Sequence, residues 1–77
     1  MNKKNFIFKA FDSKGKEINL KFSNVFYDIT EEMAEGIRIG WECGLYQKYE
    51  NPRVICSEAT EEELREYEER LYKALGL

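Results

Sequence analysis

The stretch GIRIGWECGLYQ, residues 36–47, has two interpretations, and the choice between them decides the fold. As a strand it offers the alternation of Ile37, Ile39 and Trp41, which covers only three positions. As a helix it continues a series of apolar residues spaced by four. That series consists of Met33, Ile37, Trp41 and Leu45. We predict a helix over residues 30–44, because the longer pattern agrees with a helix start signal just upstream.

Each end of this helix has two candidate positions. At the start, Asp28 with Glu31 fits a capping box, and Thr30 is an alternative N-cap. At the end, Gly44 can serve as a left-handed cap, or the helix can continue to about Tyr49.

The glycines of this helix raise an energetic question. Gly36 and Gly40 each cost about 1 kcal/mol relative to alanine in a helix interior. One explanation is that both pack against the protein's own sheet and that Gly44 is only a cap. The others are that a face without side chains lets a second copy, or a different protein, approach closely. The sequence leaves all three open.

The residues before this helix predict a β-hairpin. Period-two patterns over residues 5–12 and 17–27 flank a polar turn, SKGK, that contains Gly15. The apolar residues on one face of each strand should form the buried side of the sheet. These residues are Phe6, Phe8, Ala10, Ile18, Leu20 and Phe22.

The residues after the helix predict a third strand. Pro52 breaks the chain, and an apolar run then gives a strand over residues 53–57. The alternative is a second hairpin with residues 45–49 as its first arm, which requires the preceding helix to end at Gly44.

A second helix over residues 60–75 carries the clearest local signals. Thr60 with Glu63 forms a capping box, and Gly76 ends the helix. We expect its apolar stripe to be buried. The stripe consists of Leu64, Tyr67, Leu71, Ala74 and Leu75. Three Glu-before-cation pairs four residues apart should add about 1 kcal/mol together. They are Glu61–Arg65, Glu66–Arg70 and Glu69–Lys73.

These elements predict an α+β fold with a small, mainly antiparallel three-stranded sheet and two helices, in the order ββαβα. The 77 residues are expected to form a single domain, residues 1–77, of a size for which one small core gives little net stability. The hydrophobic content of 43% and charged content of 35% are typical of a globular chain.

The chain contains no histidine, which removes the commonest general base and the usual partner of a serine or cysteine nucleophile. Cys43 and Cys56 alone cannot supply the four ligands of a structural zinc site, and no phosphate-binding or calcium-binding loop is present. We therefore expect no enzymatic activity, no metal and no cofactor. No export signal or membrane span is visible, so we expect a cytoplasmic protein with reduced cysteines.

The net charge of −3 is unevenly distributed along the chain. Residues 1–27 carry six lysines against two acidic residues, a net charge of +4, whereas residues 28–77 have a net charge of −7. The lysine-rich hairpin gives a third-ranked hypothesis of nucleic-acid binding, weakened by the acidic remainder. Such an asymmetry concerns partners and solubility rather than fold.

Two groups of residues are candidates for binding. The first, for a protein partner or for self-association as a dimer, combines the glycines with aromatic residues that a small core cannot hold. It consists of Gly36, Gly40, Trp41, Tyr46, Tyr49 and Tyr72. The second is an acidic face that could enter a basic, nucleic-acid-binding groove of another protein. It consists of Glu58, Glu61, Glu62, Glu66 and Glu69. We expect a non-catalytic accessory or regulatory protein, with an acidic inhibitor as the alternative.

Overall fold

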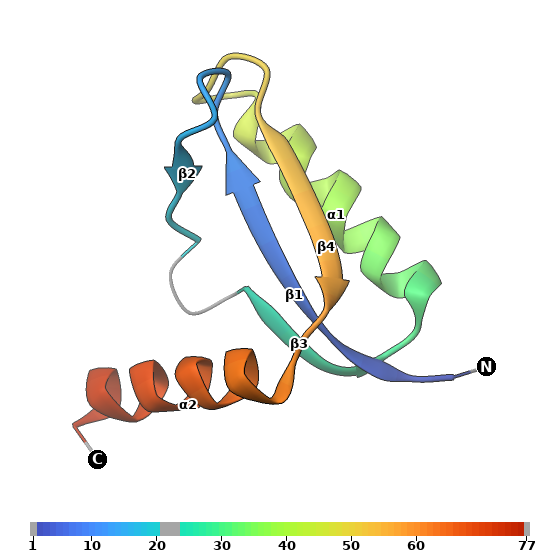
Figure 1. Ribbon diagram of the computed structural model, residues 1–77. Coiled ribbons are helices and arrows are strands. Elements are labelled where there is room, and N and C mark those ends of the chain that lie inside the picture. The colour runs from blue at the N-terminus through green and yellow to red at the C-terminus, as the bar shows by residue number, and fades with distance from the viewer. Residues whose placement is uncertain (1, 21–23, 77) are drawn as a thin grey trace.

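The computed structural model describes residues 2–20 and 24–76, and it confirms the α+β class and the order ββαβα (Figure 1). The predicted second strand is present as two separate strands, so the described residues form four strands and two helices. The elements are β1 (Lys4–Phe11), β2 (Glu17–Ile18), β3 (Val25–Ile29), α1 (Glu31–Leu45), β4 (Arg53–Glu58) and α2 (Glu61–Leu75).

The sheet is built around β1, and every pairing in it is antiparallel. The whole of β4 runs along one side of β1, while β2 and β3 share the other side. Ala10 of β1 pairs with Ile18 and Ile7 pairs with Val25, so the chain advances seven positions while β1 advances three. The prediction of one continuous strand over residues 17–27 is therefore wrong, because the four additional residues of this segment cannot pair in register with β1. Residues 21–23, including the predicted buried Phe22, lie outside the described part.

The core lies between α1 and the face of β1 that carries Phe6, Phe8 and Ala10. Phe8 has no exposed surface, and Ala34 on the helix is 1% exposed. The rings of Phe8, Phe26 and Trp41 form a cluster with centroids 5.1, 5.5 and 5.6 Å apart in edge-on or tilted arrangements. Aromatic pairs prefer such geometries, so this cluster anchors α1 to the sheet.

The ends of α1 settle the open alternatives. Thr30 is the N-cap, since its Oγ1 accepts a hydrogen bond from the N–H of Met33 at 3.2 Å. The helix runs to Leu45 with Tyr46 as a right-handed C-cap, so Gly44 is a helical residue and not a left-handed cap. It stops short of Tyr49, and the segment after Leu45 is a turn, so the alternative second hairpin is not formed.

Helix α2 lies on the opposite face of the sheet and is held loosely. Its predicted start and end are confirmed, with Thr60 and Glu63 exchanging hydrogen bonds of 2.9 and 3.1 Å and Gly76 in the left-handed conformation. No residue of α2 is buried. The predicted buried stripe is therefore wrong, since its first part is half-buried and Leu75 is 64% exposed. Figure 1 shows the reason, because the C-terminal half of α2 extends beyond the sheet.

Candidate functional site

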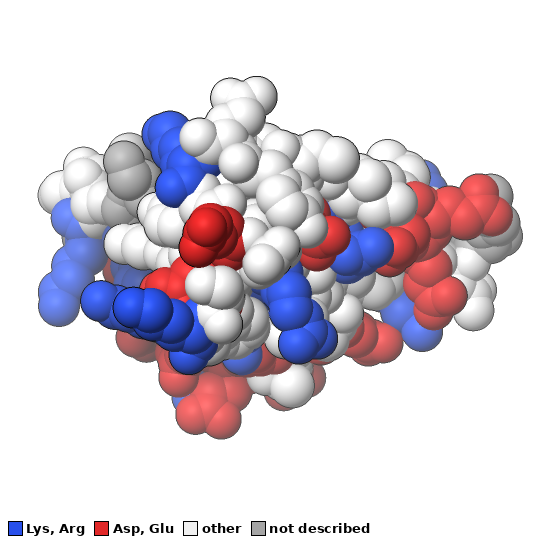
Figure 2. Space-filling model, turned by 90° about the horizontal axis from the view of Figure 1, so that it is seen from above, with Lys and Arg blue, Asp and Glu red and all other residues white. Residues whose placement is uncertain are grey.

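One side of α1 faces away from the core and is exposed along its length. We call it the α1 outer face, and it consists of Met33, Gly36, Ile39, Gly40, Cys43, Gly44 and Tyr46. Met33, Ile39 and Tyr46 are 53%, 48% and 56% exposed, which is unusual for large apolar and aromatic side chains. In Figure 2 the upper edge of the molecule is mostly uncharged apart from a basic group at the upper left, whereas most charged side chains lie across the middle, along the lower half and at the right-hand end.

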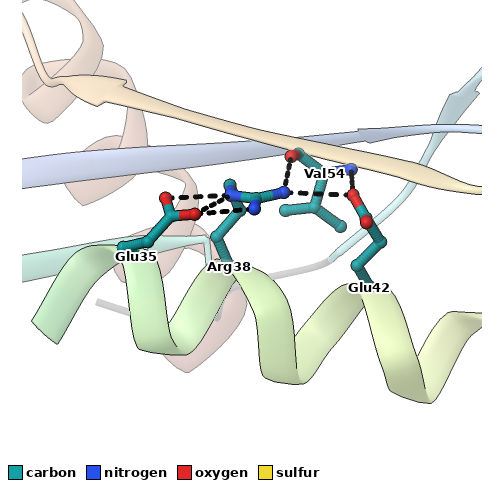
Figure 3. A network of polar contacts seen from close by, with 4 residues as sticks. All are labelled: Glu35, Arg38, Glu42 and Val54. Carbon is teal, nitrogen blue, oxygen red and sulfur yellow. Dashed lines mark hydrogen bonds and ion pairs between the residues drawn. The ribbon is translucent and has the colours of Figure 1, made fainter. Parts of the chain in front are cut away.

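The α1 outer face lacks charge because the charged residues of this segment turn inward. Between Gly36 and Tyr46 the only charged residues in the sequence are Arg38 and Glu42. Arg38 Nη1 donates a hydrogen bond to the carbonyl oxygen of Val54 at 3.3 Å, and Glu42 Oε2 accepts one from the N–H of Val54 at 3.0 Å (Figure 3). We call this arrangement the Val54 clamp. Both backbone groups of Val54 point away from β1, so α1 supplies the partners that a neighbouring strand would otherwise provide.

A further ion pair fixes the orientation of Arg38. Glu35 receives hydrogen bonds from Arg38 Nε at 3.0 and 3.1 Å and from Nη2 at 2.7 Å. These hydrogen bonds lower the pKa of the Glu35 carboxyl below its usual value. Glu42 accepts from Nη1 of the same guanidinium at 3.2 Å. The arginine is thus held between two carboxylates of its own helix.

The three glycines of α1 do not pack against the rest of the protein. A Cβ placed at Gly36, Gly40 or Gly44 would meet no atom within 4 Å beyond the helix's own neighbouring backbone. None of the three has the left-handed backbone that favours glycine. The interpretation in which Gly36 and Gly40 lie against the sheet is therefore wrong. Glycine makes a helix less stable than alanine does. Neither backbone conformation nor internal packing explains why glycine is present at these three positions.

An apolar groove lies beside two of these glycines. It has a volume of about 320 Å³ and is lined by Leu20, Gly40, Trp41, Gly44 and Leu45. One part of Trp41 belongs to the aromatic cluster, and the residue as a whole is only partly buried. Since none of the described residues that line it is charged, the groove suits an apolar side chain from another molecule.

The structure brings together most of the residues predicted for a protein partner. Gly36, Gly40 and Tyr46 lie on the α1 outer face and Trp41 lines the groove. Tyr49 follows in the turn after α1 and is exposed, whereas Tyr72 is exposed on α2, which lies on the other face of the sheet. The predicted partner-binding group omitted four exposed members of the α1 outer face and two further lining residues of the groove. The four are Met33, Ile39, Cys43 and Gly44, and the two lining residues are Leu20 and Leu45.

The predicted acidic face is exposed, and most of it carries unneutralised charge. Glu58 lies 3.4 Å from Lys4 Nζ, but Glu61, Glu62, Glu66 and Glu69 have no ion pair within residues 2–20 and 24–76. The three predicted pairs with Arg65, Arg70 and Lys73 are not formed. Arg70 instead places its guanidinium 6.0 Å from the centre of the Tyr67 ring. Helix α2 therefore presents a concentrated negative charge.

Two contacts hold the first half of α2 over the sheet. Lys9 Nζ lies 3.5 Å from Glu63 Oε2, and the Tyr27 hydroxyl donates to Glu68 Oε1 at 3.4 Å. Two causes raise the pKa of the Tyr27 hydroxyl. Partial burial is the larger, and the negative charge of the nearby Glu68 carboxylate is the second. Lys4 is likewise near Glu31 and Glu58, at 3.8 and 3.4 Å. Because acidic side chains already engage two lysines of the hairpin, this structure gives the nucleic-acid hypothesis no support.

A second, more polar pocket of about 540 Å³ lies between α2 and the sheet. Its lining includes Lys9, Asn24 and Glu63, and the buried Asn24 Oδ1 atom accepts no hydrogen bond from the described residues. The N–H of Thr60 lowers the pKa of Glu63, so this carboxyl is a poor proton donor near neutral pH. Among residues 2–20 and 24–76, no group of three cysteine or acidic side chains is placed to hold a metal ion.

No protein-family model, curated protein or solved structure matches this chain. In the part of the chain that the structure describes, no helix is long and apolar enough to cross a membrane.

Proposed function

We propose that this protein is a small, non-catalytic protein-binding module, acting as an accessory or regulatory protein, and that the α1 outer face is its contact surface. The supporting observation is a helix face on which exposed apolar residues surround open glycines, while Arg38 and Glu42, the charged residues between Gly36 and Tyr46, turn inward to Val54. Charged residues are depleted from the buried centres of protein interfaces, where aromatic residues and methionine are enriched.

The energetics of the glycines support the same proposal. A domain of this length has a total stability of about 4–12 kcal/mol, at about 0.05–0.15 kcal/mol per residue. Three helical glycines that pack against nothing else in the protein each lower its stability by about 1 kcal/mol relative to alanine. Retaining glycine on the outside of the helix is advantageous when another backbone must approach that surface. The residues that make the fold less stable are then those that make binding possible.

The experiment that tests this proposal separates stability from binding. Gly40→Ala should raise the stability of the isolated protein by up to about 1 kcal/mol in urea denaturation. The same change should reduce the recovery of partners in affinity capture from cell extract, analysed by mass spectrometry. Gly40→Lys should abolish their recovery while leaving the circular dichroism spectrum unchanged, since the site is open.

Ala74→Lys on α2 is the matched control, because it introduces the same side chain and the same change of charge at an exposed helical position. Partners recovered by the wild type and by this control, but not by Gly40→Lys, are expected. If the recovered proteins are indifferent to both glycine substitutions, the α1 outer face is not the contact surface.

The second candidate function is an acidic inhibitor that occupies a basic groove of a partner. It is favoured by the carboxylates of α2 that form no ion pair within residues 2–20 and 24–76. Binding of this kind must weaken steeply with added salt, since it depends on exposed charges. Glu62→Lys combined with Glu69→Lys should then abolish capture of a basic protein, whereas Gly40→Lys should not change it.

A further inference from the structure

We propose that the partner bound by the α1 outer face is a second copy of this chain, with the two α1 helices antiparallel and crossing at Gly40. This inference rests on the proposed function, because it takes the α1 outer face to be a contact surface and names what covers it. Three observations carry it: the apolar groove beside Trp41, the exposed Ile39, and the opposite charges at the two ends of the helix.

When two copies of α1 lie antiparallel, the negative end of one helix row faces the positive end of the same row in the other copy. Residues four apart lie on one side of a helix, and one such row reads Glu32, Gly36, Gly40, Gly44 and Lys48. In an antiparallel pair centred on Gly40, Gly36 of one copy faces Gly44 of the other. Glu32 then faces Lys48, which lies in the turn directly after the helix. Both are exposed, and neither has an ion pair within the described residues.

Charge also selects this orientation over the alternative. A parallel pair would place the two Glu32 side chains together and the two Lys48 side chains together, which is unfavourable. The antiparallel pair makes two Glu32–Lys48 contacts related by symmetry, as in an isologous interface. No further charged residue lies between them on this row.

The shape of the surface fits the same register. On one side of the glycine row the exposed Ile39 side chains of the two copies lie together, and on the other side the two apolar grooves beside Trp41, each of about 320 Å³, face each other. Rows of side chains spaced by four pack into each other's grooves when helices cross at about −50°, usually 8–10 Å apart. With glycine along the central row, the two backbones can approach more closely than that. A Cβ at Gly40 would lie at the crossing point itself.

The length of the surface sets the expected strength of the pairing. From Met33 to Tyr46 the α1 outer face runs for about 20 Å at 1.5 Å per residue. A standard stable interface buries about 800 Å² on each partner, more than one helix of this length offers. We therefore expect a dimer with a dissociation constant in the micromolar range.

The test is sedimentation velocity with light scattering at protein concentrations from about 5 to 500 µM, in the presence of reductant so that Cys43 cannot form a disulfide. The wild type should change from monomer to dimer across this range. Gly40→Leu should remain monomeric and folded by circular dichroism, and Ala74→Leu, at an exposed position of α2, should behave like the wild type. A wild type that stays monomeric at 500 µM would overturn self-pairing, and so would a dimer that survives Gly40→Leu.

A charge exchange tests the orientation. Glu32→Lys should weaken the dimer about tenfold, and the double variant with Lys48→Glu should restore it. Lack of restoration would overturn the antiparallel register. The capture experiment separates this inference from the proposed function. If the chain is monomeric but Gly40→Lys still loses a partner that the Ala74→Lys control retains, binding stands and only the second copy is refuted.

Discussion

Helices α1 and α2 are both 15 residues long and both begin at a threonine N-cap, yet they contact the rest of the molecule in opposite ways. Helix α1 buries Ala34 and contributes Trp41 to the aromatic cluster, while its outer face is uncharged. Helix α2 buries no residue, and its outer face is dense in carboxylates. The helix with the better local sequence signals is therefore the one that is less well packed.

This contrast shows that caps and charge pairs stabilise a helix without deciding what it packs against. The capping box, the left-handed Gly76 and the acidic first turn stabilise α2 by themselves. Helix α1 has three glycines and no basic residue in its last turn, so its stability must come from tertiary contacts. Substitutions at equivalent contacts of the two helices should make this difference measurable.

The largest difference is expected at the aromatic anchors. Trp41→Ala removes a ring that contacts both Phe8 and Phe26, and it should lower the free energy of unfolding by about 3 kcal/mol. Tyr67→Ala removes a half-buried ring 6.4 Å from that of Tyr27 and should cost about 1 kcal/mol. Urea denaturation followed by circular dichroism measures both. Equal losses would show that α2 is anchored as firmly as α1.

A smaller difference is expected at the polar contacts. Glu42→Ala leaves the N–H of Val54 without its acceptor and should cost about 1–2 kcal/mol. Glu68→Ala removes an exposed contact to Tyr27 and should cost less than about 0.5 kcal/mol. Glu42→Gln keeps an acceptor at this position and serves as the control for side-chain size. If it destabilises as much as Glu42→Ala, charge rather than hydrogen bonding is the important property.

The smallest effect is expected from the N-terminus of α2 at low pH. The pKa of Glu63 is lowered in the folded state, mainly by the N–H of Thr60, so its contribution is present above the unfolded-state value of about 4.3. That contribution is lost as the pH falls through the lower folded value. Glu63→Gln should reduce the acid-induced loss of stability by less than about 1 kcal/mol. Denaturation curves of the wild type and of Glu63→Gln at pH 6 and pH 3 measure this difference. If both proteins lose the same free energy of unfolding, the prediction is contradicted.

The sequence predicted the features of this fold that depend on nearby residues. Thr60, Glu63 and Gly76 act within one helical turn of the ends they define, so their pattern was sufficient. The second strand was wrong because its interruption depends on register against β1, and nothing in residues 17–27 alone encodes that register. The α2 stripe was wrong because burial also requires a sheet long enough to lie beneath it.

The candidate site was partly predictable for a geometrical reason. Residues spaced by four drift about 40° around a helix at each step, since a turn contains 3.6 residues. In the apolar series of α1, Trp41 and Leu45 therefore face the core, whereas Met33, at the other end, is exposed. The glycines were recognised as unusual, but only the structure shows that they lie on the outside.

The Val54 clamp has a consequence for how this small domain avoids aggregation. A strand at the margin of a sheet can recruit identical strands from other molecules, and such stacking leads toward amyloid. Arg38 and Glu42 occupy the hydrogen-bonding groups that an incoming strand would need at Val54. The same two side chains, by turning inward, leave the helix surface uncharged. The orientation of one arginine and one glutamate thus both occupies backbone groups at the margin of β4 and keeps charge off the outer face of α1.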